Sequence, residues 1–290
     1  MSIPKISNYP IPDIDDIPAN RVKWRVDTGR AALLIHDMQR YFLRFYEADS
    51  ELLQTLVNNI AKLKQWANEH GVPVFYTAQP HDQPAADRAL LNDMWGPGLT
   101  KADPEQQVIV PEIAPTDKDI VLTKWRYSAF QRSDLDAQMA ALKRDQLIVV
   151  GVYAHIGCMI TAVEAFMKDI QPFMVADAVA DFSAADHVMA LRYIAGCAGV
   201  VTQTHDILMP SGGVPLKTWL MSRVLELMHQ EANEDFDMHE NLILYGLDSL
   251  RIMRIAEELR QRGIEISLEQ LGRTPTLSNW IKLVEERDLR

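Results

Sequence analysis

Hydrophobic residues in the first two-thirds of the chain occur in short runs, and longer segments with helical spacing lie between them. Runs of this length are typical of buried strands. The pattern predicts strands at residues 31–35, 72–77, 119–123, 146–153, 173–176 and 200–204, and helices at 50–70, 133–144, 158–169 and 184–197. Strands that alternate with helices predict an α/β fold, in which helices cover both faces of a parallel sheet.

The helix predicted for Ser50–His70 has the clearest apolar stripe. Leu52, Leu56, Ile60 and Leu63 recur at helical spacing, and Gly71 follows where a glycine commonly ends a helix. The preceding residues, 1–30, are rich in Pro and Asp, and we expect an extended arm over the surface.

The last quarter of the chain has helical spacing around one short motif, Gly246-Leu247-Asp248-Ser249-Leu250. The helix predicted after it places Leu250, Met253, Ala256, Glu257 and Leu259 on one face. Ser249 is either the residue that caps this helix or an attachment point, because a helix N-terminus also stabilises a phosphodiester.

The sequence predicts a linker between the α/β part of the chain and the helical last quarter. Pro210-Ser211-Gly212-Gly213-Val214-Pro215 combines flexible glycines with prolines that stop a helix. The predicted domains are therefore residues 1–210 and 217–290, joined by a linker at 211–216.

Composition narrows the class of protein. The 290 residues are 48% hydrophobic and 24% charged, with a formal net charge of −11, which argues against a nucleic-acid partner. We expect no membrane span and no signal peptide, because no long uncharged apolar run occurs. Two cysteines, Cys158 and Cys197, cannot form a disulfide framework, so a cytoplasmic location is expected.

Candidate chemistry follows three of the predicted strands. Asp37, Lys124 and the segment Tyr153–Cys158 come directly after separate strands. Each alone has an ordinary explanation, such as a helix cap or a surface lysine. Together they occupy equivalent positions at the carboxyl edge of one sheet, where functional residues collect in this fold class.

Five segments make residues 1–210 resemble the isochorismatase-like hydrolases. They are Leu34-Ile35-His36-Asp37-Met38-Gln39, Tyr76-Thr77-Ala78-Gln79-Pro80, the segment 87–98, Lys124-Trp125-Arg126-Tyr127-Ser128-Ala129-Phe130, and Gly151-Val152-Tyr153-Ala154-His155-Ile156-Gly157-Cys158. The motif around Ser249 resembles the carrier domain of nonribosomal peptide synthetases, and Thr274-Pro275-Thr276-Leu277 resembles the turn before its last helix. Together these parts resemble the bifunctional isochorismatase and aryl carrier proteins of catecholate siderophore pathways (enterobactin or vibriobactin type).

The resemblance implies a three-layer parallel-sheet hydrolase domain and a small all-α four-helix carrier domain. The amidases of the superfamily use an Asp, Lys and Cys triad, and the position of that cysteine is Gly157 here. Cys158, the next residue, should point elsewhere. Without a thiolate there is no route to an acyl-enzyme, so amidohydrolysis is disfavoured.

The implied reaction is hydrolysis of the vinyl ether of isochorismate to 2,3-dihydro-2,3-dihydroxybenzoate and pyruvate. Asp37 is the predicted general acid, Lys124 holds a substrate carboxylate or orients Asp37, and the absent side chain at Gly157 leaves room for the enolpyruvyl group. The resemblance also suggests Gln79, Arg88 and Tyr153 as substrate contacts. Because Lys124 lowers the pKa of Asp37, desolvation and the two charges of the substrate must raise it.

No metal is expected, because no close pair of ligands accompanies His36 or His155, which are interpreted as packed or hydrogen-bonded. The large aromatic residues are expected in the core or the pocket wall; they are Phe42, Trp95, Trp125 and Phe130.

The implied cofactor is 4'-phosphopantetheine on Ser249, carrying 2,3-dihydroxybenzoate. The implied partners are a 2,3-dihydroxybenzoate-AMP ligase, a phosphopantetheinyl transferase, a condensation domain and a second copy of the chain. Six acidic residues and no Lys or Arg occur from Glu231 to Asp248, either a solvated face or a docking surface for a basic enzyme. The alternative function is a carrier and scaffold protein with an inactive hydrolase domain.

Overall fold

The computed structural model describes residues 3–14, 17–47, 50–208, 216–228, 237–261, 264 and 266–288. The chain divides into two compact units, Met1–Leu208 and Met209–Arg290. The predicted linker remains a prediction, because residues 211–215 lie outside the described residues.

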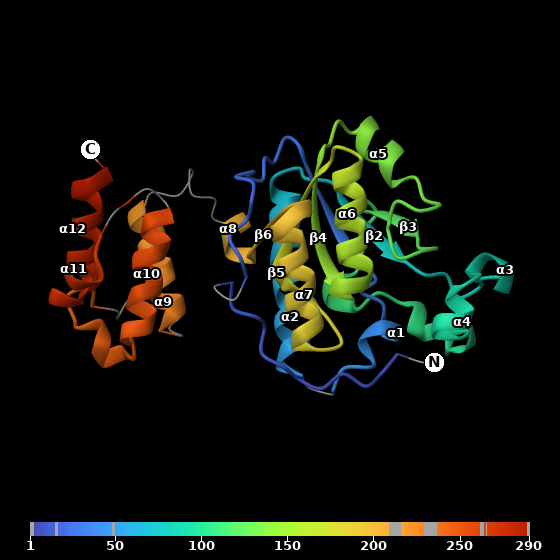
Figure 1. Ribbon diagram of the computed structural model, residues 1–290, viewed down its shortest axis with the longest axis horizontal. Coiled ribbons are helices and arrows are strands. Elements are labelled where there is room, and N and C mark those ends of the chain that lie inside the picture. Colours follow the sequence, from blue (N-terminus) through green and yellow to red (C-terminus); the bar gives the residue numbers. More distant parts are fainter. Residues whose placement is uncertain are drawn as a thin grey trace. The chain divides into compact units, whose positions relative to one another are not determined.

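One parallel sheet organises the first unit (Figure 1). Its strands lie in the order β3-β2-β1-β4-β5-β6. Their bounds are β1 Ala31–His36, β2 Val74–Ala78, β3 Ile120–Thr123, β4 Gln146–Val152, β5 Gln171–Ala180 and β6 Val200–Thr202. The parallel α/β fold is therefore confirmed. The predicted strand ended before the polar Asp177, whereas β5 continues through it to Ala180. Asp177 is accommodated there because it accepts hydrogen bonds from Thr204 and Asn59.

Helices cover the two faces of this sheet. The longer ones are α2 Glu51–Glu69, α5 Leu135–Ala141, α6 Met159–Met167 and α7 Ala184–Tyr193; the shorter ones are α1 Arg40–Leu43, α3 Ala85–Arg88, α4 Leu91–Trp95 and α8 Thr204–Leu208. Two π-helical turns, Ala154–Cys158 and Ile194–Ala198, precede α6 and follow α7. α2 packs on one face, and α5, α6 and α7 pack on the other.

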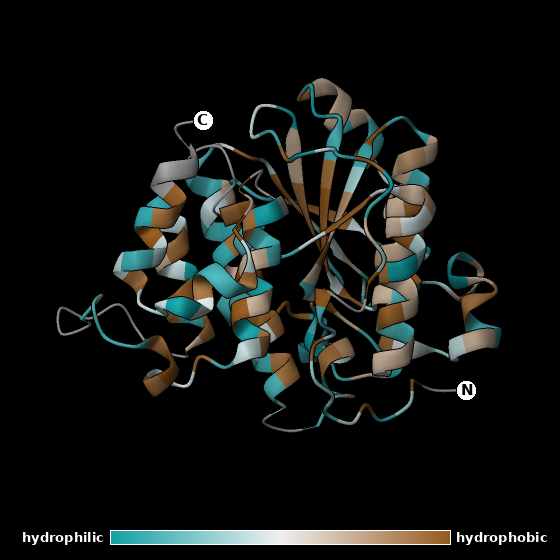
Figure 2. Cartoon of the chain, turned by 60° about the vertical axis from the view of Figure 1, so that its left-hand side comes forward, coloured by the Kyte–Doolittle hydropathy of each residue, from teal (hydrophilic) through white to brown (hydrophobic). Residues whose placement is uncertain are grey.

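The alternation of side chains along β1 explains the three layers. Leu33 and Ile35 join the core beneath α2, whereas Ala32 and Leu34 join the core beneath α6 and α7. Every residue of β1 is buried, as expected for a strand covered on both sides. Figure 2 shows the hydrophobic residues along these central strands and mixed residues on the helices.

The N-terminal residues form the expected extended arm. Ile6 is buried and pairs with Tyr46 through a short bridge. Further along, the side chain of Asn20 exchanges two hydrogen bonds with the backbone of Val201 in β6. The arm is thus held near Tyr46 by Ile6 and at strand β6 by Asn20.

The second unit is a helical bundle, as the resemblance implied. Its described helices are α9 Leu216–Leu227, α10 Ser249–Gln261, α11 Leu268–Arg273 and α12 Leu277–Asp288. Trp280 is fully buried at the centre of its core and donates a hydrogen bond to the carbonyl of Leu271. The Arg223 guanidinium on α9 bonds both carboxylate oxygens of Glu258 on α10.

No helix among the described residues is long and apolar enough to cross a membrane.

Candidate active site and carrier serine

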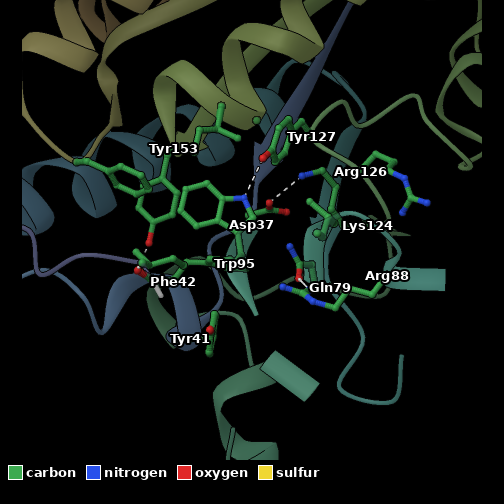
Figure 3. A pocket seen from close by; sticks show the side chains of 15 residues that line it. Asp37, Tyr41, Phe42, Gln79, Arg88, Trp95, Lys124, Arg126, Tyr127 and Tyr153 are labelled. Carbon is green, nitrogen blue, oxygen red and sulfur yellow. Dashed lines mark hydrogen bonds and ion pairs between the residues drawn. The ribbon is translucent and has the colours of Figure 1, made fainter. Parts of the chain in front are cut away.

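The carboxyl ends of three strands bring the predicted catalytic pair together. Asp37 follows β1 and Lys124 follows β3, and the Nζ atom of Lys124 lies 2.8 Å from Oδ2 of Asp37. Figure 3 shows the two side chains directed toward each other. Both are buried, with only 9% of the Asp37 side chain and 4% of the Lys124 side chain exposed. The pair is therefore shielded from bulk water.

Thr77 near the end of β2 is the third member of this group, and it was not among the predicted site residues. Its hydroxyl donates to Oδ1 of Asp37 at 2.6 Å and accepts from the Asp37 backbone N–H at 3.1 Å. These bonds hold Asp37 in a left-handed conformation, with φ of 51°. The carboxylate has no freedom to turn away from Lys124.

The pKa of Asp37 is lowered overall. Burial raises it, but the charge of Lys124, the nearby His36 and the hydrogen bonds from Lys124 and Thr77 outweigh burial. Desolvation and Lys124 therefore shift the pKa of Asp37 in opposite directions before substrate binds, as expected, and the net effect is a lowered pKa. In this state Asp37 is a carboxylate and needs a proton before it can act as an acid.

Gly157 lies within the π-helical turn Ala154–Cys158 and lines the same cavity as Asp37. A Cβ atom built on Gly157 would lie 2.1 Å from Cε1 of His36. The imidazole ring of His36 therefore fills the volume of a side chain at this position, and a role of Gly157 in leaving room for the enolpyruvyl group stays a prediction.

Arg88 and Gln79 adjoin each other in the wall of the cavity (Figure 3). Arg88 is 4% exposed, so it is not the solvated loop residue that its sequence context allowed. Its Nε donates to the Gly96 carbonyl at 2.9 Å and its Nη1 to Oε1 of Gln79 at 3.3 Å. Gln39, which the sequence did not single out, holds the backbone N–H and carbonyl of Gln79.

Aromatic rings form much of the remaining wall. The cavity encloses about 570 Å³, its open mouth included, and its aromatic lining residues are Tyr41, Phe42, Trp95, Tyr127, Tyr153 and Phe182. Tyr153 lines it with its ring, because its hydroxyl donates to the Phe42 carbonyl at 2.7 Å. Of the other predicted aromatic residues, Phe130 lies in the core, and Arg132 stacks over Trp125.

Cys158 is fully buried in the core on the far side of the turn. Burial raises the pKa of its thiol well above the ordinary value, which removes the thiolate that a nucleophile needs. The expectation that Cys158 points away from the site is confirmed.

His155 bonds the buried Asp181, as its hydrogen-bonded interpretation predicted. Its Nδ1 lies 2.6 Å from Oδ1 of Asp181, and with Asp186 they form a group of three possible metal ligands that the sequence did not indicate. Asp181 also accepts from the backbone N–H groups of His155 and Phe182. These hydrogen bonds satisfy the buried carboxylate of Asp181.

Ser249 is exposed at the first residue of α10. The capping residue is Asp248, whose Oδ1 accepts from the Arg251 backbone N–H at 2.9 Å, so the Ser249 hydroxyl is not needed as the cap. Gly246 turns the chain into the motif with φ of 89°, a conformation that favours glycine. The arrangement leaves the serine open to modification.

Only part of the face predicted for α10 is buried in the core. Its core residues are Ile252, Ile255 and Leu259, whereas Leu250 is 75% exposed and Met253 is 51% exposed. α10 carries a second apolar stripe beside Ser249, and helical spacing alone could not tell which stripe the core covers.

Comparisons with known proteins agree with both sites. The isochorismatase domain family matches residues 31–206, and the phosphopantetheine attachment site family matches residues 218–284. Enterobactin synthase component B of Escherichia coli strain K12 is 48% identical over 284 residues, or 98% of each chain. The chain belongs to the isochorismatase family. The isochorismatase of Bacillus subtilis strain 168 is 45% identical over an alignment of 303 residues, which covers 99% of this chain and 96% of that one.

We refer to Met1–Leu208 as the isochorismatase unit and to Met209–Arg290 as the carrier unit. The first has isochorismatase activity, and the second carries covalently attached 4'-phosphopantetheine. Among solved structures, a cysteine hydrolase from Pseudomonas syringae pv. phaseolicola has a TM-score of 0.58 and 26% identity, covering 66% of this chain and 95% of that chain. The fold is thus shared with a protein named as a cysteine hydrolase.

Proposed function

We propose that the isochorismatase unit hydrolyses the vinyl ether of isochorismate, and that the carrier unit then presents 2,3-dihydroxybenzoate as a thioester on Ser249. The observation that carries the first half is the buried carboxylate of Asp37, held by Lys124 and Thr77 in a cavity whose turn has glycine at position 157. Such a site can move a proton but offers no thiolate for covalent attack.

The first step is binding of the dianionic substrate. One substrate carboxylate competes with Asp37 for the ammonium of Lys124, and the buried Arg88 binds a carboxylate with support from Gln79. The added negative charge and the removal of water by the bound substrate both raise the pKa of Asp37, so the carboxylate takes up a proton. Tyr153 contacts the substrate through its ring.

Asp37 then transfers this proton to the terminal methylene carbon of the enolpyruvyl group. The carbon becomes a methyl group, and the positive charge is spread over the adjacent carbon and the ether oxygen. Water adds to the adjacent, positively charged carbon, which bears the ether oxygen, and returns one proton to Asp37. The resulting hemiketal collapses to pyruvate and 2,3-dihydro-2,3-dihydroxybenzoate, so no group of the protein is consumed.

The carrier unit takes part after the product has been oxidised elsewhere. Ser249 accepts the arm from a phosphopantetheinyl transferase, and a 2,3-dihydroxybenzoate-AMP ligase loads the aryl group for a condensation domain. The described residues that precede and follow Ser249 in the chain support such docking, since they include the exposed acids Asp237 and Glu240 and the exposed Leu244 and Leu250. The acids from 231 to 235 lie outside the described residues.

We further propose that two isochorismatase units associate. α6 exposes Ile160 and Met167, and α7 exposes Met189 and Tyr193. Exposed apolar side chains on adjoining helices are typical of a protein interface. The free thiols of Cys158 and Cys197 fit a reducing compartment, so we place the protein in the cytoplasm.

Two measurements on the purified full chain test these proposals. Incubation with isochorismate, with pyruvate coupled to lactate dehydrogenase, should give steady turnover; no turnover would favour the inactive scaffold. Treatment with coenzyme A and a transferase should raise the intact mass by roughly 340 Da. Subsequent incubation with ATP, the ligase and 2,3-dihydroxybenzoate should add the aryl group; no further mass gain would contradict the aryl thioester.

A further inference from the structure

We propose that His36 closes position 157, where the amidases of the superfamily carry their nucleophilic cysteine. The ring of His36 occupies the volume in which a side chain at position 157 would lie, and this restricts the site to proton transfer. His36 is then a specificity-determining residue of the isochorismatase unit. The proposal goes beyond the acid role of Asp37 and does not depend on it.

The clash at position 157 is severe. A Cβ atom there would lie 2.1 Å from Cε1, 2.7 Å from Nδ1 and 2.9 Å from Nε2 of His36, all below the 3.0 Å limit that real Cβ contacts respect. The backbone of Gly157 is not in the left-handed region, so its conformation alone does not require glycine. The ring of His36 is therefore what excludes a side chain.

The ring cannot easily move aside. His36 is fully buried at the end of β1, its Nδ1 lies 3.1 Å from the Val152 carbonyl, and its Nε2 lies 3.3 Å from the Thr161 hydroxyl. The Thr161 oxygen in turn accepts from the Ala129 backbone N–H at 2.9 Å. Displacing the ring would break these contacts in a region without solvent.

The same contacts keep His36 out of the chemistry. Burial, with the nearby charge of Lys124, lowers its pKa to about 4, so the ring is neutral. Nδ1 lies beside the Val152 carbonyl and Nε2 beside the Thr161 hydroxyl, and the backbone of Tyr127 also bonds the ring. Neither nitrogen is left to act on a substrate.

The closed position adjoins the catalytic pair. Gly157 lines the cavity together with Asp37 and Lys124, and Nδ1 of His36 lies 3.5 Å from Oδ2 of Asp37. A thiol at 157 would stand near the Lys124 ammonium, which favours a thiolate. Removing the ring should thus open a site for a reactive cysteine.

Stability measurements on the full chain test the steric part. Gly157→Ala should lower the Tm of the isochorismatase unit by about 5 °C or more. Gly196→Ala is the matched control, because Gly196 also lies in a π-helical turn and a Cβ there meets nothing within 4 Å; its Tm should stay within about 1 °C. In a His36→Ala background, Gly157→Ala should cost at most half as much. Equal losses with and without His36, or a tolerated Gly157→Ala, would overturn the proposal.

Thiol labelling tests the chemical part. In a Cys197→Ser background, the pair His36→Ala and Gly157→Cys should be alkylated by iodoacetamide at residue 157 at least tenfold faster than Cys158, as located by peptide mass. Labelling no faster than at the buried Cys158 would count against an open nucleophile position. If His36→Ala unfolds the unit, His36→Val provides the same comparison with a residue that suits the end of a strand.

Discussion

The ammonium of Lys124 and the carboxylate of Asp37 lie 2.8 Å apart although their strands are not neighbours in the sheet. β2 runs between β1 and β3, and its Thr77 adds the third contact to the carboxylate. Three adjacent strands thus hold one ionised acid in a buried site.

Asp37→Asn should lower kcat for pyruvate release by about 10²- to 10⁴-fold, because the amide cannot donate the required proton. The matched control is Asp136→Asn, at an exposed surface ion pair, which should keep wild-type turnover. Intact mass after transferase treatment should show unchanged loading of Ser249. A variant that retained more than a tenth of the activity would remove Asp37 from the acid role.

The pH dependence should show that the protonated acid is the active form. Because the pKa of Asp37 is lowered in the unliganded site, its protonated fraction rises about tenfold per unit fall in pH across the neutral range. We therefore expect kcat/KM to fall as pH rises. Calorimetry of a dianionic, unreactive analogue in buffers of different ionisation enthalpy should detect uptake of about one proton. A flat kcat/KM profile with no proton uptake would contradict this mechanism.

Arg88→Lys should raise KM by roughly 10- to 100-fold, with a smaller change in kcat. The guanidinium is fixed by Gly96 and Gln79, and a lysine can keep the charge but not the paired geometry. Arg30→Lys, at an exposed ion pair with Asp145, serves as the control and should leave both constants unchanged. Equal falls in kcat and kcat/KM with no change in KM would place Arg88 in the transition state instead.

Ser249→Ala should abolish the mass gain of roughly 340 Da while pyruvate release stays at the wild-type rate. Asp248→Ala should also destabilise the carrier unit by about 1 kcal/mol, because the Arg251 N–H loses its cap; Asp248→Asn keeps an accepting oxygen and should cost less. Chemical denaturation followed in the carrier unit distinguishes the two variants. Residual loading of the Ser249→Ala protein would mean that another residue carries the arm.

Acid should destabilise the isochorismatase unit between about pH 6.5 and pH 4. Burial lowers the pKa values of both His36 and His187 to about 4, so the unfolded chain binds protons first as the pH falls. Stability is then lost through this window, by up to about 3 kcal/mol for each histidine. His187→Gln should make the loss of Tm across the window shallower than in the wild type. An unchanged slope would show that His187 is not neutral in the folded unit.

Local patterns were sufficient for the elements and for several site residues. Short apolar runs located the strands, and polar residues just after them identified Asp37 and Lys124. Thr77 could not be identified in this way, because threonine is common near strand ends. Only the structure shows that its hydroxyl makes two hydrogen bonds with Asp37. The spacing in α10 could not show that Leu250 is exposed, because the helix bears apolar residues on two faces and only one meets the core.

The sequence by itself determined the alternation of strands and helices, the fold class, the carrier motif and the glycine at position 157. Those features depend on residues close together in the chain, whose spacing decides which local structure can bury them. Only the tertiary structure decided that Lys124 meets Asp37 across 87 residues, and that the ring of His36 fills the space beside Gly157. The order of strands in the sheet and the packing between them are non-local, so no run of neighbouring residues contains them.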